Sequence, residues 1–224
     1  EFTLTGVDLT SYGRDLSEQP TLGSLIRQIL KAVPKVRRLR LSSLDPAAID
    51  SDLWLVIAEE PKFMPHLHLS IQAGDDLILK RMKRRHSRKD VVDCCARALA
   101  LRPNLTLGAD FIAGFPTETE SMFKRTLSLV QECNLSSLHV FPYSPRENTP
   151  AAQMPMVPIK LRRERAARLR SMETKIRNEV LNSQIGKQTE VLVEKIHYGR
   201  TENNFPVQLN NPAKPGDILF VSYT

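Results

Sequence analysis

The sequence predicts an α/β protein in which a parallel, barrel-like sheet precedes a small all-β module. Three observations predict it. Strand-like and helix-like stretches alternate along residues 2–155, each expected strand ends in polar or Gly- and Pro-rich residues, and short period-two stretches joined by turns follow residue 183. Repeated strand, helix, strand units pair in parallel with right-handed crossovers. Five such units suit an open or closed barrel better than a two-layer sandwich.

Residue alternation, capping residues and prolines predict the bounds of the strands and helices. Five strands are expected, over residues 2–9, 36–41, 66–72, 105–115 and 138–141. Thr21 is placed to cap the first helix, Pro34 ends it, and Ser87 is placed to cap a helix after the third strand. A long helix is expected over 160–181.

The third strand organises the rest of the chain. Leu67, Leu69 and Ile71 alternate with polar residues, which predicts a strand with one apolar face. Gln72 then lies beside a glycine turn and a helix that opens at Asp75, a geometry in which α/β enzymes hold polar ligands. An ordinary strand-to-helix corner would give the same pattern.

Chemistry in such folds sits at the carboxyl ends of the strands. All five expected exits are polar or rich in Gly and Pro, and together they are better evidence than any one of them. The exits are Gly6 to Thr10, Ser42 to Asp45, Gln72 to Gly74, Gly114 to Glu118, and Phe141 to Arg146.

The charge balance favours an anionic partner. The chain has 32 Lys and Arg against 25 Asp and Glu, a formal net charge of +7, and dense basic runs over 80–89 and 160–177. Such runs suit a polyanion, most plausibly nucleic acid, although solvated helix faces are also often basic. Aromatic residues make up only 6% and are not interleaved with these runs, which argues against a stacking platform for single strands.

No apolar run reaches the roughly 18–20 residues of a membrane span, and no signal-peptide pattern opens the chain, so a cytoplasmic location without membrane partners is expected. The first residue is Glu1 rather than Met, and residues 2–5 already read as a strand. We therefore expect an N-terminally incomplete chain.

The three cysteines, Cys94, Cys95 and Cys133, fall in amphipathic helical stretches and are expected to be small buried hydrophobes. No CxxC pair is present, so neither a four-cysteine zinc site nor closely spaced iron–sulfur ligands can form. No metal ligand and no catalytic residue is assigned within the chain.

Five ordered motifs carry a family resemblance. They are LTGVDLTSYG (4–13), LSSLDP (41–46), HLHLSIQAGDDLILKRMKRRHSR (66–88), GADFIAGFPTETE (108–120) and FPYSPRENTPAAQMP (141–155). In order and spacing they resemble the radical S-adenosylmethionine methylthiotransferases that modify tRNA, and the LTGV opening resembles the branch acting on threonylcarbamoyladenosine at position 37. The C-terminal module resembles the TRAM domain with which these enzymes grip RNA.

This resemblance implies three parts: a partial (β/α) radical-SAM barrel lacking its first strand over 1–155, a linker helix over 156–183, and a TRAM-like RNA-binding barrel over 184–224. It also implies S-adenosylmethionine and two 4Fe–4S clusters as cofactors of the full-length protein. The cluster cysteines would lie upstream of Glu1, so no cluster is expected in this chain, which should be inactive alone.

The implied reaction is 2-methylthiolation of adenosine 37. A reduced cluster would cleave S-adenosylmethionine to a radical that abstracts the adenine C2 hydrogen, before a methylated sulfur is inserted. The implied partners are a tRNA anticodon stem-loop and a reductant. Two alternatives stay open: a sister methylthiotransferase acting on isopentenyladenosine-37 or a ribosomal protein, and a non-catalytic RNA-binding protein.

Residue by residue, the resemblance implies that Asp8, Gln72, Arg84 and Gly114 contact the cofactor. A guanidinium at Arg84 suits the methionine carboxylate. Arg146, Arg162, Arg163 and Lys195 are the expected RNA contacts, and Glu118 is expected to cap the helix that follows it. The chain departs from the family pattern at Ser70, Ala73 and His86, where proline, serine and tyrosine are usual.

Overall fold

The computed structural model describes all residues 1–224. Its larger part is built on five parallel strands in sequence order: β1 (Phe2–Leu4), β2 (Leu39–Leu41), β3 (His66–Gln72), β4 (Thr106–Ala113) and β5 (Leu135–Pro142). β1 pairs with β2, and β3, β4 and β5 form a second ladder. Bridges from Leu39 to Phe63 and from Leu44 to Leu69 connect the two. This open parallel arrangement confirms the predicted fold class.

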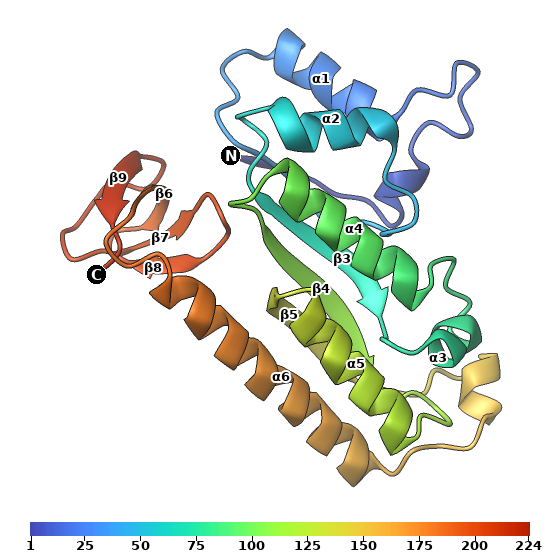
Figure 1. The fold of residues 1–224 in the computed structure, drawn as a ribbon. Coiled ribbons are helices and arrows are strands. Elements are labelled where there is room, and N and C mark those ends of the chain that lie inside the picture. The colour runs from blue at the N-terminus through green and yellow to red at the C-terminus, as the bar shows by residue number, and fades with distance from the viewer.

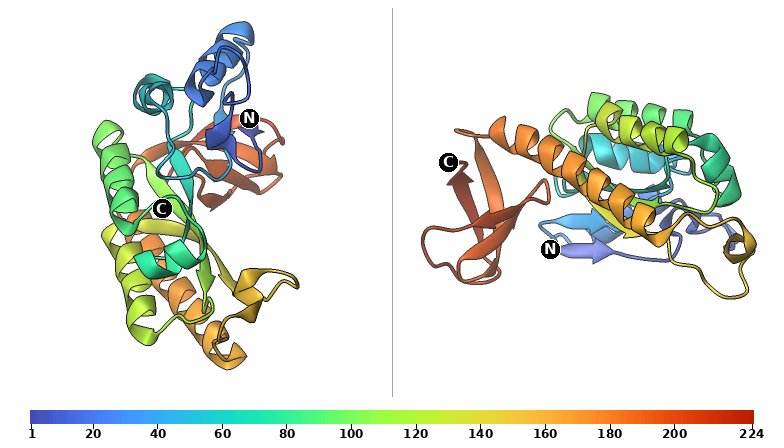
Figure 2. Two further views of the ribbon diagram at one scale, coloured as in Figure 1. Left: turned by 90° about the vertical axis from the view of Figure 1, so that its right-hand side faces the viewer. Right: turned by 90° about the horizontal axis from the view of Figure 1, so that it is seen from below.

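Helices cover one side of these strands (Figures 1 and 2). They are α1 (Leu22–Ala32), α2 (Ser51–Glu59), α3 (Asp76–Arg81), α4 (Arg88–Leu101), α5 (Glu120–Glu132) and α6 (Ile159–Asn182), with 3-10 turns η1 (Leu9–Ser11) and η2 (Pro150–Gln153). The predicted caps are present: Thr21 accepts a hydrogen bond from the Ser24 amide, and Ser87 forms a capping box with Asp90.

The apolar face of β3 lies in the core, as its alternation predicts. Leu67, Leu69 and Ile71 are at most 1% exposed, and they belong to one buried cluster that extends from α1 to Ile176 of α6. α6 therefore packs as part of the α/β unit instead of standing apart as a linker. Its Arg170 Nη2 also donates to the Val140 carbonyl of β5 (2.7 Å).

The C-terminal module is a four-stranded antiparallel sheet at the C-terminal end of α6 (Figure 1). Its strands are β6 (Gln188–Lys195), β7 (Tyr198–Thr201), β8 (Pro206–Gln208) and β9 (Ile218–Ser222), in the order β8-β7-β6-β9. Val191, Val193 and Leu209 form its own small core. We call residues 184–224 the β-module; the division of the chain at 155 and 183 stays a prediction.

Two buried arginines, Arg38 just before β2 and Arg40 within it, hold the β-module against the α/β unit. Arg40 donates to the carbonyls of Thr201 and Glu202 (both 2.9 Å), and Arg38 donates to that of Arg200 (3.4 Å). The Thr106 hydroxyl donates to the Asn203 carbonyl (2.9 Å). The loop after β7 is thus docked at the amino-terminal ends of the strands.

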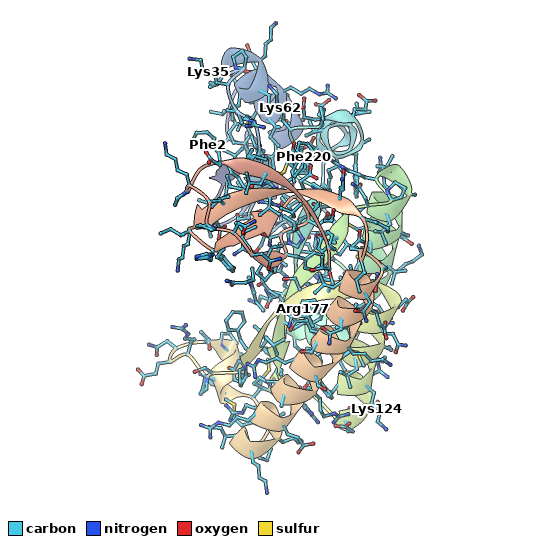
Figure 3. All side chains as sticks on the ribbon, turned by 90° about the vertical axis from the view of Figure 1, so that its left-hand side faces the viewer. Phe2, Lys35, Lys62, Lys124, Arg177 and Phe220 are labelled. Carbon is cyan, nitrogen blue, oxygen red and sulfur yellow. The ribbon has the colours of Figure 1, made fainter.

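Three expected strands are shorter than predicted, the fourth only slightly, since it spans Thr106–Ala113 instead of 105–115. The first ends at Leu4, because residues 5–15 form loop and 3-10 structure, and the second begins only at Leu39. β1 has a neighbour on one side only, and its Phe2 is 62% exposed at the margin of the molecule (Figure 3). None of the helices combines the length and the apolar character that crossing a membrane requires.

Candidate functional site

The exit of β3 presents Gln72 in an unusual backbone conformation. Its φ is +71°, and the Ala73 amide donates to the Ile71 carbonyl (2.9 Å), which closes a three-residue turn around it. The pairing of β3 with β4 also shifts register between Leu69 and Gln72. A non-glycine residue held in this way stores strain, and irregularities of this kind re-aim side chains at functional sites.

Gln72 and Arg84, predicted separately, line one cavity of about 350 Å³. Its apolar lining includes Met82, Ile112 and Phe115 near the β4 exit, and Ala151 of η2. The volume lies within the roughly 300–1,000 Å³ of small-molecule sites. A larger hollow of about 800 Å³ lies between α6, β8 and β9, but it contains none of the predicted cofactor residues.

One of the hydrogen-bond donors of Arg84 is already used within the protein, and another is not. Its Nη2 donates to the Ser70 carbonyl of β3 (2.8 Å), whereas its Nε is buried and has no hydrogen-bond partner. A buried N–H without a partner is costly, so it favours a ligand that accepts a hydrogen bond. The donor set of this cavity therefore fits the carboxylate and polar groups of S-adenosylmethionine.

Gly114 lies at the β4 exit, next to the cavity but not in its lining. Its φ is +73°, and a Cβ placed there would come within 2.5 Å of Arg162 Cγ, so Arg162 of α6 already occupies the space beside it. The Gly114 amide donates to Glu118 Oε2 (2.9 Å). Contact of this backbone with the cofactor stays a prediction.

Glu118 has a structural role, but it is not the helix cap that the sequence suggests. Thr119 caps α5, while Glu118 is buried and accepts from Gly114 and from Arg165 Nη1 (2.8 Å). Burial raises the pKa of Glu118, and the nearby Arg165 charge only partly opposes this shift.

Asp8 is exposed and lies apart from the cavity lining. It accepts hydrogen bonds from Thr10 and Ser11 and forms an ion pair with Arg85 (2.9 Å). The Ser11 hydrogen bond is the main cause that lowers the pKa of Asp8. Because Arg85 also approaches Asp45 (3.5 Å), it links the exits of the first two strands.

The four predicted RNA contacts do not form one patch. Arg146 is exposed in the loop after β5, and Arg163 is exposed near the start of α6. Lys195 lies in the β-module, beyond the other end of α6, whose 24 residues span about 36 Å. The Arg162 guanidinium instead donates to the Val157 (2.6 Å) and Tyr143 (2.9 Å) carbonyls, so it braces the start of the helix.

The sheet side away from the helices carries a polar cluster that the sequence analysis did not assign to the site. Asp110 Oδ1 of β4 lies 3.0 Å from His68 Nε2 of β3 and 3.1 Å from His139 Nδ1 of β5. The Ser43 hydroxyl donates to Asp110 Oδ2 (3.1 Å). Burial acts to raise the pKa of Asp110, but the hydrogen bonds and charges of His68, Ser43 and His139 outweigh it and lower the pKa.

A signal for this cluster does exist in the sequence. Period-two alternation puts His66 and His68 on the polar side of the third strand, and His139 two residues before Phe141 on the fifth. The alternation does not give the register between strands, and it is this register that pairs Asp110 with His139. The donor atoms of His68, Asp110 and His139 lie within 4.8 Å of one another, so they could also hold a metal ion.

The three cysteines are buried and free, as predicted. Burial raises the pKa of Cys94 to about 12, which disfavours the thiolate that a metal requires. Cys94 and Cys95 sit on α4, and Cys133 caps the end of α5. These residues do not fit an iron–sulfur cluster.

Comparison with known proteins gives the family. Residues 3–130 of the 224 match the family described as the Radical SAM superfamily. A protein of Escherichia coli, coproporphyrinogen III oxidase (HemN), described as a radical SAM enzyme, has a similar fold with a TM-score of 0.54. It is 18% identical and covers 71% of this chain and 38% of its own.

Two curated relatives are closer in sequence. Threonylcarbamoyladenosine tRNA methylthiotransferase MtaB of Rickettsia prowazekii is 50% identical over 219 residues, which is 98% of this chain and 52% of the relative. A tRNA-2-methylthio-N(6)-dimethylallyladenosine synthase of Acetivibrio thermocellus is 36% identical over 95% of this chain and 46% of its own length. The chain spans about half the length of these relatives. Since the family match covers more than half of its residues, the chain belongs to the radical SAM superfamily.

Proposed function

We propose that this chain is the cofactor- and substrate-binding part of a tRNA methylthiotransferase that acts on N6-threonylcarbamoyladenosine at position 37. The single observation that carries this is the 50% identity, over 98% of the chain, to a relative named for that reaction. The cavity shared by Gln72 and Arg84 at the carboxyl ends of the strands supports it, because this is where α/β barrels place their chemistry.

In this proposal the cavity holds the methionine end of S-adenosylmethionine. Arg84 binds the carboxylate through its free Nε, Gln72 orients a polar group of the cofactor, and Ile112 and Phe115 exclude water. S-adenosylmethionine, when bound and reductively cleaved, supplies the radical that activates the adenine C2 position. The residues of the chain then have to hold the nucleoside next to that cofactor.

The three buried cysteines do not fit an iron–sulfur cluster. In this proposal, residues of the full-length protein other than 1–224 supply the ligands of its two 4Fe–4S clusters. The chain alone is then inactive, and the full-length enzyme also needs a reductant.

The proposed macromolecular partner is a tRNA anticodon stem-loop. The net charge of +7 and the exposed Arg146, Arg163 and Lys195 support an RNA ligand, since phosphate contacts dominate such affinities. With tRNA as substrate, the enzyme would act in the cytoplasm. The isopentenyladenosine-type reaction is the second candidate, favoured by the 36% identity to a dimethylallyladenosine synthase.

The test uses the full-length protein with reconstituted clusters and anticodon stem-loops that carry threonylcarbamoyladenosine, dimethylallyladenosine or adenosine at position 37. We expect a methylthio group, detected by nucleoside mass spectrometry, on the first stem-loop only. Methylthiolation of the dimethylallyl stem-loop alone would move the second candidate forward. Failure on every stem-loop, with intact clusters and S-adenosylmethionine cleavage, would overturn the proposal.

Substitutions in the cavity test whether Arg84 and Gln72 bind S-adenosylmethionine. Arg84→Ala and Gln72→Ala should each weaken S-adenosylmethionine binding at least about tenfold, which is the order expected for one charged hydrogen bond. Lys89→Ala is the matched control, because Lys89 is 81% exposed on α4 and pairs only with Asp93. If all three variants bind S-adenosylmethionine with equal affinity, Arg84 and Gln72 do not contribute to cofactor binding.

A further inference from the structure

The His68–Asp110–His139 cluster presents an imidazole, rather than a carboxylate, to its surroundings. The His139 side chain is 62% exposed, whereas those of Asp110 and His68 are 18% and 10% exposed. Both Asp110 oxygens already accept hydrogen bonds, from the two histidines and from Ser43. The centroid of the His139 ring also lies 4.4 Å from that of the His68 ring, so contacts with both Asp110 and His68 fix the position of the ring.

The cluster lies two residues along the strands from the cavity that Gln72 and Arg84 line. Asp110 and Ile112 point to the same side of β4, because they are two residues apart, and Ile112 lines the cavity. His139 pairs with Asp110, as Phe141 pairs with Ile112. Two residues along a strand measure about 7 Å. The exposed His139 ring therefore lies about 7 Å along the sheet from the Ile112 position of the cavity lining.

We propose that His139, oriented by Asp110 and His68, binds the N6 substituent of the target nucleoside and selects one that is polar and donates a hydrogen bond. This inference rests on the proposed function and deepens it, since it names the side chain that separates the two candidate substrates. A threonylcarbamoyl group has N–H and hydroxyl groups, which can donate a hydrogen bond to a ring nitrogen, whereas a dimethylallyl group has no donor.

The preference for the threonylcarbamoyl group follows from the free energy lost when His139 Nε2 is buried without a hydrogen-bond partner. The Asp110 carboxylate only accepts hydrogen bonds, so His139 Nδ1 donates to it, and in the neutral imidazole Nε2 is left as a hydrogen-bond acceptor for a ligand. An alkyl substituent against Nε2 would remove its water and offer no hydrogen bond, and a site built around a polar contact rejects an analogue that lacks it. Asp110 sets the ring orientation, as carboxylates do for imidazoles elsewhere.

The test measures affinity before activity. The full-length protein is titrated with labelled stem-loops that carry threonylcarbamoyladenosine, dimethylallyladenosine or adenosine at position 37. For His139→Ala we expect the affinity for the first stem-loop to fall about tenfold, and the affinity for adenosine to change by less than about twofold. His139→Gln keeps a side-chain hydrogen-bond acceptor, its amide oxygen, and should recover part of the loss. Lys124→Ala, an exposed charge on α5 (Figure 3), should leave the discrimination unchanged.

The outcomes separate the two proposals. If the wild-type protein prefers the threonylcarbamoyl stem-loop and His139→Ala keeps that preference, the role of His139 is refuted and the proposed function stands. If the wild-type protein neither binds nor modifies that stem-loop, both fail. Stoichiometric Zn²⁺ bound by the wild-type protein and lost in His139→Ala would assign the cluster to a metal ion and refute the substrate role. Thermal unfolding of both His139 variants verifies that they fold.

Discussion

Arg165 Nη1 lies 2.8 Å from Glu118 Oε2 and 2.9 Å from the Glu118 carbonyl oxygen, with both side chains at most 2% exposed. This pair joins α6 to the loop that follows β4. Because Glu118 also accepts the Gly114 amide, the pair fixes the strand exit beside the cofactor cavity. A contact between residues 47 positions apart therefore supports the site without lining it.

Replacing Arg165 by Met should destabilise the protein by about 3–5 kcal/mol, because a buried carboxylate then loses its counter-charge. Glu118→Gln should cost less, since the amide oxygen can still accept from Gly114. Urea denaturation measures both changes. Arg163→Met, at an exposed neighbouring position, serves as the control. A loss no greater than that of the control would show that the pair contributes little.

Gly114→Ala should destabilise the protein far more than Gly186→Ala. Both glycines have positive φ, +73° and +81°, so both substitutions carry the backbone penalty of about 1 kcal/mol. Only at Gly114 does the new methyl group meet a neighbour, Arg162, whereas nothing lies within 4 Å at Gly186. Thermal unfolding compares the two. Equal shifts would mean that Arg162 moves aside without cost.

Acid should weaken the fold through His66. Burial lowers the pKa of His66 to about 3 from its usual 6.5, so the folded state excludes a proton that the unfolded state binds. Stability from this group is complete above pH 6.5 and falls as the pH drops toward 3, by about 2 kcal/mol at pH 5. Denaturation of wild type and His66→Gln at pH 7 and 5 isolates this effect. The same pH slope in both proteins would contradict it; His197→Gln, in the β-module, is the control.

Arg40→Ala should loosen the β-module without unfolding the sheet. Two hydrogen bonds from a buried guanidinium, to Thr201 and Glu202, would be lost, at a cost of about 2 kcal/mol or more. Amide hydrogen exchange should accelerate across residues 198–205 and stay slow in β3 and β4. Lys195→Ala, exposed on the same module, should not change either region. Uniform acceleration throughout the chain would indicate global destabilisation instead.

Local signals explain which elements were predictable. Thr21 and Ser87 cap their helices because a hydroxyl satisfies free amides within three residues, a contact that sequence spacing fully describes. The family resemblance implies Gln72 and Arg84 one by one, and the fold brings them to the same cavity because one short turn and helix separate them. Arg162 was assigned to RNA by its charge alone, which does not reveal that its guanidinium turns to the Val157 and Tyr143 carbonyls.

Periodicity and the chemistry of neighbouring residues are enough to predict the parallel α/β class, the apolar face of β3, the buried cysteines and the polar strand exits. Three features appear only in the folded chain: α6 joins the main core, Arg40 holds the β-module, and His68, Asp110 and His139 meet on one side of the sheet. The hydrogen bonds among these contacts join residues 29 to 162 positions apart. Strand register and helix docking create them, and neither is encoded in any local pattern.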